Sequence, residues 1–440
     1  MEKQIQSIIK KIYGDIPEDQ IKQKSTEILT RIQKKDYDFI NNVNKEKYTH
    51  KTEQGKKVRS IYSYPKESIE NILCEYLKIK IDQSFKIKYP NRKIIINSLF
   101  STLPVIKDLN DFVIIRYDFK SFFDSVSSSE VYNNYILNSS ISRSDKDIFD
   151  DYCKNIPFCY AGIQTSNAMT ELACNDFDKV FKSKLKNYGV VFCERYVDDG
   201  LVILNNYVSK DDVLPLIQDS INDVFKESKV IINMSKFQYI SRREIAEISN
   251  FDFLGYDFTL YKEPRSFSFK FGITSAKIFK YKMKIKQIFN DYKKTNDMEM
   301  LRHRIKLFSS RVVYSLDSND ETCDWVAKGL IENYGELKYH IEDLDEKTKK
   351  FMQNIYYDVM NEIGVTQPYF FPRNFNDEQN SIYCIYSNMR RNRSMIFHPS
   401  TGLRSNILLK EIKKIYPQYV YINKTYNHIA KDYLEILKIQ

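Results

Sequence analysis

The stretch from Val190 to Leu204 constrains the fold more than any other part of the chain. Two apolar segments flank Asp198-Asp199-Gly200, and Asp-Gly between hydrophobic runs is a strong signal for a β-hairpin. The sequence therefore predicts a hairpin with two adjacent carboxylates at its tight turn. Carboxylates this close repel one another, and each raises the pKa of the other. An ordinary solvated turn is one interpretation, and a site for a divalent cation, which removes the repulsion, is the other.

A third aspartate follows a predicted buried strand. The apolar run Phe112 to Ile115 ends in charged and turn-forming residues between Asp118 and Asp124, as expected of a strand inside a core. Asp118 is therefore the candidate for a carboxylate that bridges two metal ions. The five histidines are scattered and the seven cysteines contain no C-x-x-C pair, so any catalytic metal must be held by carboxylates. We expect two Mg²⁺ ions as the cofactor, with Mn²⁺ as the alternative.

The rest of the pattern predicts an α+β protein. Helices are expected within residues 1–48, 66–85, 165–185 and 211–229, and strands or hairpins within 51–64, 112–115, 190–204, 230–240 and 251–260. After Ile273 the pattern is mostly helical. We expect an N-terminal helical segment (1–50), a mixed region of strands and helices (51–260) and a mostly α-helical C-terminal region (261–440).

The positive charge is concentrated in the C-terminal part. The chain has a net charge of +10, of which residues 261–440 contribute +9, from 30 Lys and Arg against 21 Asp and Glu. A polyanion such as nucleic acid is one explanation, and solvated lysines on helices are the other. Arg390, Arg391 and Arg393 lie near Tyr383, Tyr386 and Phe397, which suits phosphate contact with base stacking. The alternative there is a solvated loop with core aromatics.

Six short motifs together resemble those of reverse transcriptases. They are, in chain order, Lys57-Val58-Arg59, Ile114 to Phe123 around Asp118, Gly162 to Asn167, Tyr196-Val197-Asp198-Asp199, Lys236, and Phe253-Leu254-Gly255-Tyr256. They cover residues 50–260. The resemblance implies a right-hand polymerase core with an antiparallel palm sheet, in which residues 51–260 are the fingers and palm and residues 261–440 the α-helical thumb and C-terminal domain.

The resemblance also assigns roles to individual residues. Asp118, Asp198, Asp199 and the backbone carbonyl of Phe119 would bind the metal ions, and Lys236 would protonate pyrophosphate unless it is a solvated lysine. Lys57, Arg59, Gly162 and Gln164 would bind the nucleotide, and Phe253, Leu254, Gly255 and Tyr256 would form the primer grip. Phe123 would lie under the sugar and exclude a 2′-hydroxyl, which favours DNA synthesis; its alternative is a core phenylalanine.

Two residues depart from the common reverse transcriptase pattern. Ala161 stands where glutamine is frequent before Gly162, and Asn167 stands where proline is frequent. The chain is most similar to the defence-associated and abortive-infection reverse transcriptases, which implies antiphage DNA synthesis that either copies an RNA or is protein-primed and untemplated. The alternatives are a catalytically inactive nucleic-acid-binding scaffold and an RNA polymerase of the same fold.

The expected partners and location follow from the same residues. The partners would be dNTPs and nucleic acid, namely an RNA template or partner non-coding RNA and the DNA product. Self-association into a homo-oligomer stays open. The first residues contain no apolar run for secretion, and no stretch approaches the ~20 apolar residues of a membrane span, so we expect a cytoplasmic protein without a membrane partner.

Overall fold

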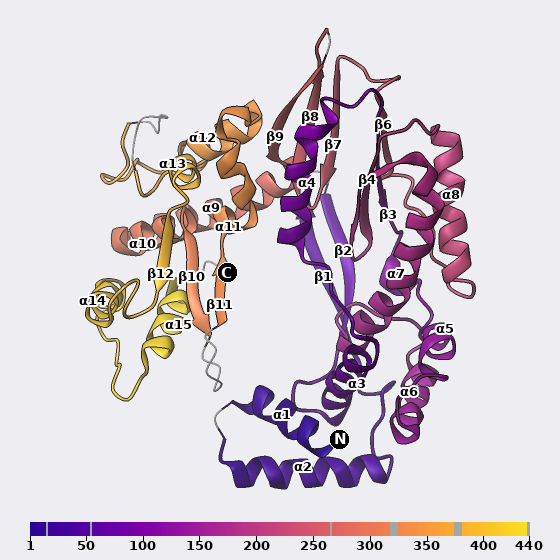
Figure 1. The fold of residues 1–440 in the computed structure, drawn as a ribbon. Helices are drawn as coiled ribbons and strands as arrows, with labels where there is room; N and C mark the ends of the chain where they lie inside the picture. Colours follow the sequence, from indigo (N-terminus) through magenta and orange to yellow (C-terminus); the bar gives the residue numbers. More distant parts are fainter. Residues whose placement is uncertain (15, 53–54, 265, 317–323, 374–380, 438–440) are drawn as a thin grey trace. The chain divides into compact units, whose positions relative to one another are not determined.

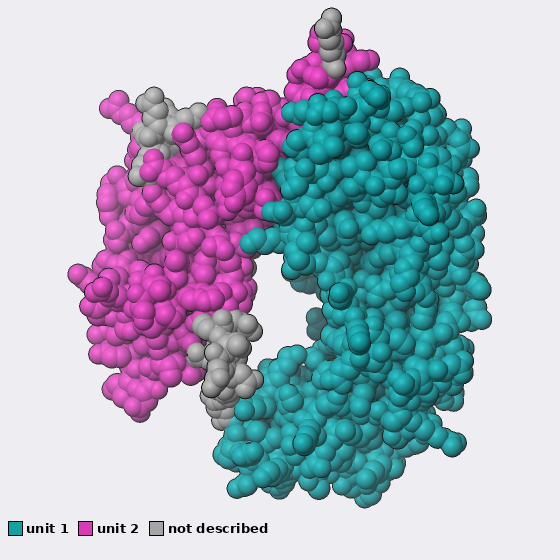
Figure 2. Space-filling view, viewed as in Figure 1, with its two compact units in different colours: residues 1–245 teal, residues 246–440 magenta. Residues whose placement is uncertain are grey.

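The computed structural model describes residues 1–14, 16–52, 55–264, 266–316, 324–373 and 381–437. The chain divides into two compact units, Met1–Ile245 and Ala246–Gln440 (Figure 2). Both units mix helices with mainly antiparallel strands (Figure 1), which confirms the α+β class; the fingers, palm and thumb layout stays a prediction. The domain limits at 50 and 260 also stay predictions, and both residues lie within strands.

Unit 1 combines a β-hairpin, a four-stranded sheet and a set of helices. Its helices are α1 (Glu2–Tyr13), α2 (Glu18–Gln33), α3 (Ile69–Phe85), α4 (Arg92–Ile106), α5 (Ser128–Val131), α6 (Arg143–Asn155), α7 (Gln164–Leu185) and α8 (Lys210–Val224). Its strands are β1 (Asn44–Thr52), β2 (Gly55–Ser63), β3 (Val113–Asp118), β4 (Val190–Tyr196), β5 (Asp199–Leu204) and β6 (Gln238–Ser241). Strands β1 and β2 form the predicted hairpin, and the sheet has the antiparallel order β4-β5-β3-β6.

Strand β3 is central in this sheet, and all six of its residues are buried. Val113, Ile115 and Tyr117 belong to the same hydrophobic core as the helices. Because side chains alternate along a strand, Arg116 and Asp118 project from the opposite face. The sheet therefore has one face in the core and one that carries polar groups.

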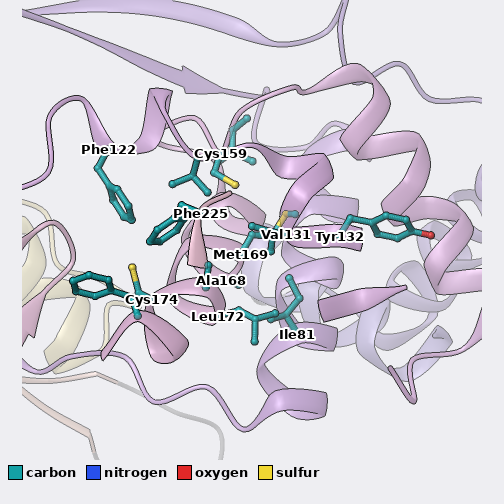
Figure 3. Close-up of a cluster of buried hydrophobic side chains, with 14 of the residues drawn as sticks. Ile81, Phe122, Val131, Tyr132, Cys159, Ala168, Met169, Leu172, Cys174 and Phe225 are labelled. Carbon is teal, nitrogen blue, oxygen red and sulfur yellow. The ribbon is translucent and has the colours of Figure 1, made fainter. Parts of the chain in front are cut away.

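Helix α7 supplies much of the core of unit 1. Its buried residues include Ala168, Met169 and Leu172, which Figure 3 shows among side chains from other elements. The helix packs against α3 and α8. The predicted helix over 165–185 is thus confirmed, and its broad apolar face is explained by neighbours on several sides.

Two local expectations for unit 1 were wrong. Residues 44–48 are the start of β1 and not helix. In the segment 230–240, regular strand begins at Gln238. The apolar residues Val230 and Ile232 are buried there, because an isolated bridge joins Ile232 to Phe119. The segment was mistaken for a strand because its buried loop residues are as apolar as those of a strand.

Unit 2 contains two small sheets as well as helices. Its strands are β7 (Ile248–Phe253), β8 (Tyr256–Lys262), β9 (Phe267–Ile273), β10 (Arg311–Leu316), β11 (Asp324–Lys328) and β12 (Ser394–Phe397). Its helices are α9 (Ser275–Thr295), α10 (Met298–Phe308), α11 (Leu330–Asn333), α12 (Glu346–Ile363), α13 (Ile385–Arg390), α14 (Ser405–Ile415) and α15 (Tyr426–Leu437).

The expectation of a mostly helical region after Ile273 misses the second of these sheets. Its order is β11-β10-β12, and β12 pairs in parallel with β10 although the two are far apart in sequence. Local periodicity does not report such a pairing, because short strands are stabilised by distant partners. Among the described residues, no helix combines the length and the apolar character that crossing a membrane requires.

Candidate active site

The four-stranded sheet of unit 1 places Asp118 and Asp199 opposite one another. They are register partners in the antiparallel pairing of β3 with β5. Directly opposed residues share one face of a sheet, and Arg116, two residues before Asp118, lies on the same face. One face of the sheet therefore carries two of the three predicted carboxylates and a cation.

Asp198 lies in the turn between β4 and β5. Tyr196 pairs with Asp199, so Val197 and Asp198 form the two-residue connection. Val197 has a φ of 61°, whereas Asp198 does not have a positive φ; this combination is that of a type II′ turn. The predicted hairpin is confirmed, but the turn predicted at Asp199-Gly200 lies two residues earlier, because Asp199 and Gly200 already belong to β5.

Side-chain packing, and not turn geometry, explains why residue 200 is a glycine. A Cβ atom at this position would lie 2.1 Å from Cζ of Tyr117, which is the register partner of Gly200 in β3. The Tyr117 ring is buried against Phe177 and Phe181 of α7. The glycine thus lets an aromatic ring occupy the core face of the sheet, next to the row that carries Asp118 and Asp199.

The backbone after β3 is joined to the turn and to the loop before β6. The N–H of Phe119 donates to the carbonyl of Asp198 at 3.1 Å, and the N–H of Asn233 donates to the carbonyl of Asp118 at 2.7 Å. The side chain of Phe119 is buried in the core. Asp118 and Asp198 are therefore brought together by main-chain bonds as well as by the sheet.

The side chain of Asp118 has two partners from this loop. Asn233 donates from Nδ2 to Oδ1 of Asp118 at 2.9 Å, and Nζ of Lys236 lies 2.5 Å from Oδ2. Lys236 is in the turn that precedes β6 and not on a strand as predicted. Lys236 therefore lies beside Asp118, but it is positioned by a turn and not by a strand.

The electrostatics of the three aspartates differ. Burial, followed by the charge of Asp118, raises the pKa of Asp198, while the charges of Lys236 and Arg59 act in the opposite direction. Burial raises the pKa of Asp199 to about 6. Arg116 opposes this shift with Nε 3.1 Å from Oδ1 and Nη2 3.3 Å from Oδ2 of Asp199. Asp199 is thus held by a two-point ion pair, which sets it apart from Asp198.

The carboxylates of the site determine whether a metal ion could be bound there. Within the described residues, no group of three or more His, Cys, Asp or Glu side chains is arranged to hold a metal ion. Besides burial, the charge of Asp118 raises the pKa of Asp198, and the charges of Asp118 and Asp198 both raise the pKa of Asp199, which Arg116 engages. Two mutually repelling carboxylates are a chemical fit for a hard divalent cation. In the structure, the Lys236 ammonium supplies a positive charge beside Asp118.

Four of the predicted nucleotide-binding residues belong to the β1–β2 hairpin or to the segment that packs on it. Gly162 has a φ of +103°, and a Cβ there would lie 2.4 Å from the carbonyl oxygen of Tyr62 in β2. Gln164 begins α7, with Nε2 3.4 Å from Oδ1 of Asn71. Arg59 is exposed on β2; the side chain of Lys57 lies outside the described residues. The hairpin is thus packed directly on the loop that contains Gly162.

Phe123 is half-buried, in contrast to its neighbour Phe122. The Phe122 ring is in the core, 5.8 Å from the ring of Phe123 and 6.1 Å from that of Phe225. The core alternative weighed for Phe123 therefore describes Phe122 better. A partly exposed ring five residues after Asp118 stays available for contact with a sugar.

The four predicted primer-grip residues form a hairpin tip in unit 2. Phe253 ends β7 and Tyr256 begins β8, and Leu254 and Gly255 connect them with φ values of 50° and 86°. This confirms the hairpin predicted around Gly255. Phe253 and Tyr256 are buried in unit 2, and their assigned role stays a prediction.

The arginine cluster in unit 2 is partly as expected. Arg390 and Arg391 are exposed and Arg393 is half-buried. Tyr386 and Phe397 are buried in the core, so they are not free to stack on bases, and the core alternative is correct for both rings.

Two residues at the site escaped the sequence analysis. Arg116 holds Asp199, and Asn233 holds Asp118. A charged residue inside the otherwise apolar run of β3, two positions from Asp118, was the signal for Arg116. Asn233 carried no such signal, since its position depends on a long-range bridge.

Comparisons with known proteins add little. No family model and no curated protein matches the chain. Among solved structures, the chain is similar to an apo telomerase from Candida tropicalis truncated from the C-terminal domain, with a TM-score of 0.34 and 12% sequence identity. That match covers 57% of this chain and 60% of the telomerase chain. A likeness at this level carries no conclusion about activity.

Proposed function

We propose that this chain is a DNA polymerase of reverse transcriptase type, which transfers nucleotides from dNTPs to a primer hydroxyl. The observation that carries the proposal is the convergence of Asp118 and Asp198. One ends a buried central strand, the other lies in a neighbouring turn, and main-chain bonds through Phe119 join them. The order of the six motifs in the sequence supports the same assignment.

The residues have distinct tasks in this proposal. Asp118 and Asp198 would hold two Mg²⁺ or Mn²⁺ ions, with Asp199 and the Phe119 carbonyl nearby. Such ions, when bound, supply a lowered pKa at the attacking hydroxyl and charge stabilisation at the leaving pyrophosphate. Lys236, whose Nζ lies beside Asp118, would donate a proton to pyrophosphate. Lys57 and Arg59 would contact the triphosphate and Phe123 the sugar.

A second candidate function is an inactive scaffold that binds nucleic acid. It is favoured by the finding that Asp118 and Asp199 already have cationic partners, Lys236 and Arg116. Buried carboxylates need a cationic partner, and at these two aspartates a protein side chain supplies it. An active polymerase would incorporate nucleotides and an inactive scaffold would not, so an incorporation assay distinguishes the two functions.

The test is nucleotide incorporation by the purified chain. Wild type would be incubated with Mg²⁺ or Mn²⁺ and labelled dNTPs or NTPs, with an RNA template and DNA primer and without either. We expect dNTP incorporation by wild type and none by Asp198→Asn, with an unchanged circular dichroism spectrum. Asp219→Asn, at an exposed position of α8, is the matched control. No incorporation by wild type, or full incorporation by Asp198→Asn, would refute the assignment.

The biological role is a further part of the proposal. We propose that the DNA is made in antiphage defence, by copying a partner RNA or without a template. Cells that express wild type or Asp198→Asn would be challenged with phages, and the efficiency of plating compared. Equal plating on both strains across a phage panel would contradict a defence role for the synthesis.

A further inference from the structure

Arg195, the residue before the Tyr196-to-Asp199 motif, is buried in an unusual environment. Its side chain is 2% exposed and lies between two carboxylates of α7. Nε and Nη2 donate to Asp178 at 3.0 and 2.9 Å, and Nη2 and Nη1 donate to Glu171 at 2.8 and 3.3 Å. Glu171 and Asp178 are two helical turns apart and so share one side of α7.

The fifth donor of the guanidinium reaches the turn that contains Asp198. Nη1 of Arg195 donates to the carbonyl of Val197 at 2.8 Å. A guanidinium has five N–H donors in a fixed plane, and all five are matched here. Lysine has three donors on a flexible stem and cannot make the same set of bonds.

The carbonyl that Arg195 holds belongs to a strained residue. Val197 has a φ of 61° at the turn position where type II′ turns prefer glycine. A β-branched residue with positive φ is a conformational outlier, which persists only where the surroundings enforce it. The orientation of the Val197–Asp198 peptide also sets where Asp198 lies.

The register of the sheet places Arg195 next to the residues of the candidate active site. Arg195, Gly200 and Tyr117 are register partners and form one row on the core face. The next row, Tyr196, Asp199 and Asp118, carries the carboxylates on the opposite face. Arg195 thus joins Glu171 and Asp178 of α7 to the Val197-Asp198 turn, which directly follows the row of the carboxylates.

We propose that Arg195 is a positioning residue, which with Glu171 and Asp178 holds the strained Val197 turn so that Asp198 faces Asp118. The expected effect on the reaction rate rests on the proposed polymerase function, whereas the expected effect on the conformation of the turn does not. The competing explanation is that Arg195 only neutralises two carboxylates in the core, without any effect on the turn.

The first test is local and independent of activity. Amide hydrogen exchange would be measured for wild type, Arg195→Lys and the matched control Arg143→Lys, which changes an exposed arginine of α6. We expect faster exchange for Arg195→Lys in peptides that cover residues 196–200, with α7 still protected. Equal exchange in wild type and variant, or loss of protection throughout α7, would overturn the proposal.

The second test is a double-mutant cycle with Val197→Gly, since glycine removes the strain that Arg195 is proposed to hold. Misplacement of a reacting group can cost about a hundredfold in rate, so we expect Arg195→Lys to lower kcat by about that factor with little change in KM for dNTP. In the Val197→Gly background the same change should cost about tenfold less, because glycine adopts a positive φ without the strain that Arg195 is proposed to hold. Identical losses in both backgrounds would overturn the proposal.

Two controls keep the outcomes distinct. If Arg195→Lys does not fold, Asp178→Asn is used in the same cycle, because it retains Arg195 and Glu171 and removes an acceptor that is partly exposed. If wild type incorporates no nucleotide, the proposed function fails, and the exchange experiment alone decides the role of Arg195.

Discussion

Replacing Gly200 with alanine tests the packing on which the candidate site is built. The added Cβ would lie 2.1 Å from Cζ and 2.4 Å from both Cε1 and Oη of Tyr117. Favourable carbon contacts lie at about 3.5–4.0 Å, so the ring or the strand must move by more than an ångström. The ring is confined by Phe119, Phe177 and Phe181, whose centroids are 5.7, 6.1 and 5.6 Å away.

The expected cost follows from this confinement. Overpacking of a well-packed core usually costs about 1–3 kcal/mol, and we expect Gly200→Ala to reach the upper end of that range. For a folding unit of about 150–250 residues, each kcal/mol lowers the Tm by about 2–4 °C, so a fall of about 6–12 °C is expected. Polymerisation should also fall, since Asp199 is the next residue of β5.

Thermal unfolding of wild type and Gly200→Ala would measure this cost. Gly335→Ala is the matched control, because a Cβ at Gly335 would meet nothing within 4 Å. Tyr117→Leu, which removes the ring, should reduce the penalty of Gly200→Ala in the double variant. The reasoning is refuted if Gly200→Ala unfolds at the same temperature as Gly335→Ala.

The other predictions concern the sugar, the pH and nucleic acid. If Phe123 packs against the incoming sugar, Phe123→Ala should raise the ratio of rNTP to dNTP incorporation, and an unchanged ratio in a folded variant would contradict that contact. The raised pKa of Asp199, about 6, means that the folded state holds this proton more tightly than the unfolded state, so the free energy of unfolding should increase as the pH falls through 6. Between pH 7.5 and 5 the gain from Asp199 is about 1.4 kcal/mol; denaturant titration without metal should show a larger gain for wild type than for Asp199→Asn, in which the raised pKa of Asp198 still contributes. Replacing Arg390, Arg391 and Arg393 by glutamine should weaken RNA and DNA binding and flatten its salt dependence, because fewer counterions are released; an unchanged salt slope would mean that these arginines serve only solubility.

The sequence alone was sufficient for features that depend on neighbouring residues. Alternating and continuous apolar patterns predicted β3, the β4–β5 hairpin and α7, because burial in these elements follows the local period of strand or helix. The order of the motifs also selected Asp118, Asp198 and Lys236, which the structure brings together.

Features set by distant partners needed the tertiary structure. The turn was predicted at Asp-Gly, but the space occupied by the Tyr117 ring, and not turn geometry, accounts for Gly200. The loop that contains Asn233 resembled a strand in composition, since a bridge to Phe119 buries it. In each case a contact across the sheet decided the conformation.

The ion pairs that the site residues form could not be predicted from the sequence either. That Arg116 pairs with Asp199, while Arg195 binds α7 and the Val197 carbonyl, depends on which face of a strand each arginine occupies. Arg116 lies two residues before Asp118 in β3, and Arg195 directly follows Glu194 in β4; their alternating positions alone do not say which face is the core. The sequence thus identified the aspartates and Lys236 as candidates, and contacts across the sheet and with α7 decided which charged groups pair and which residue is strained.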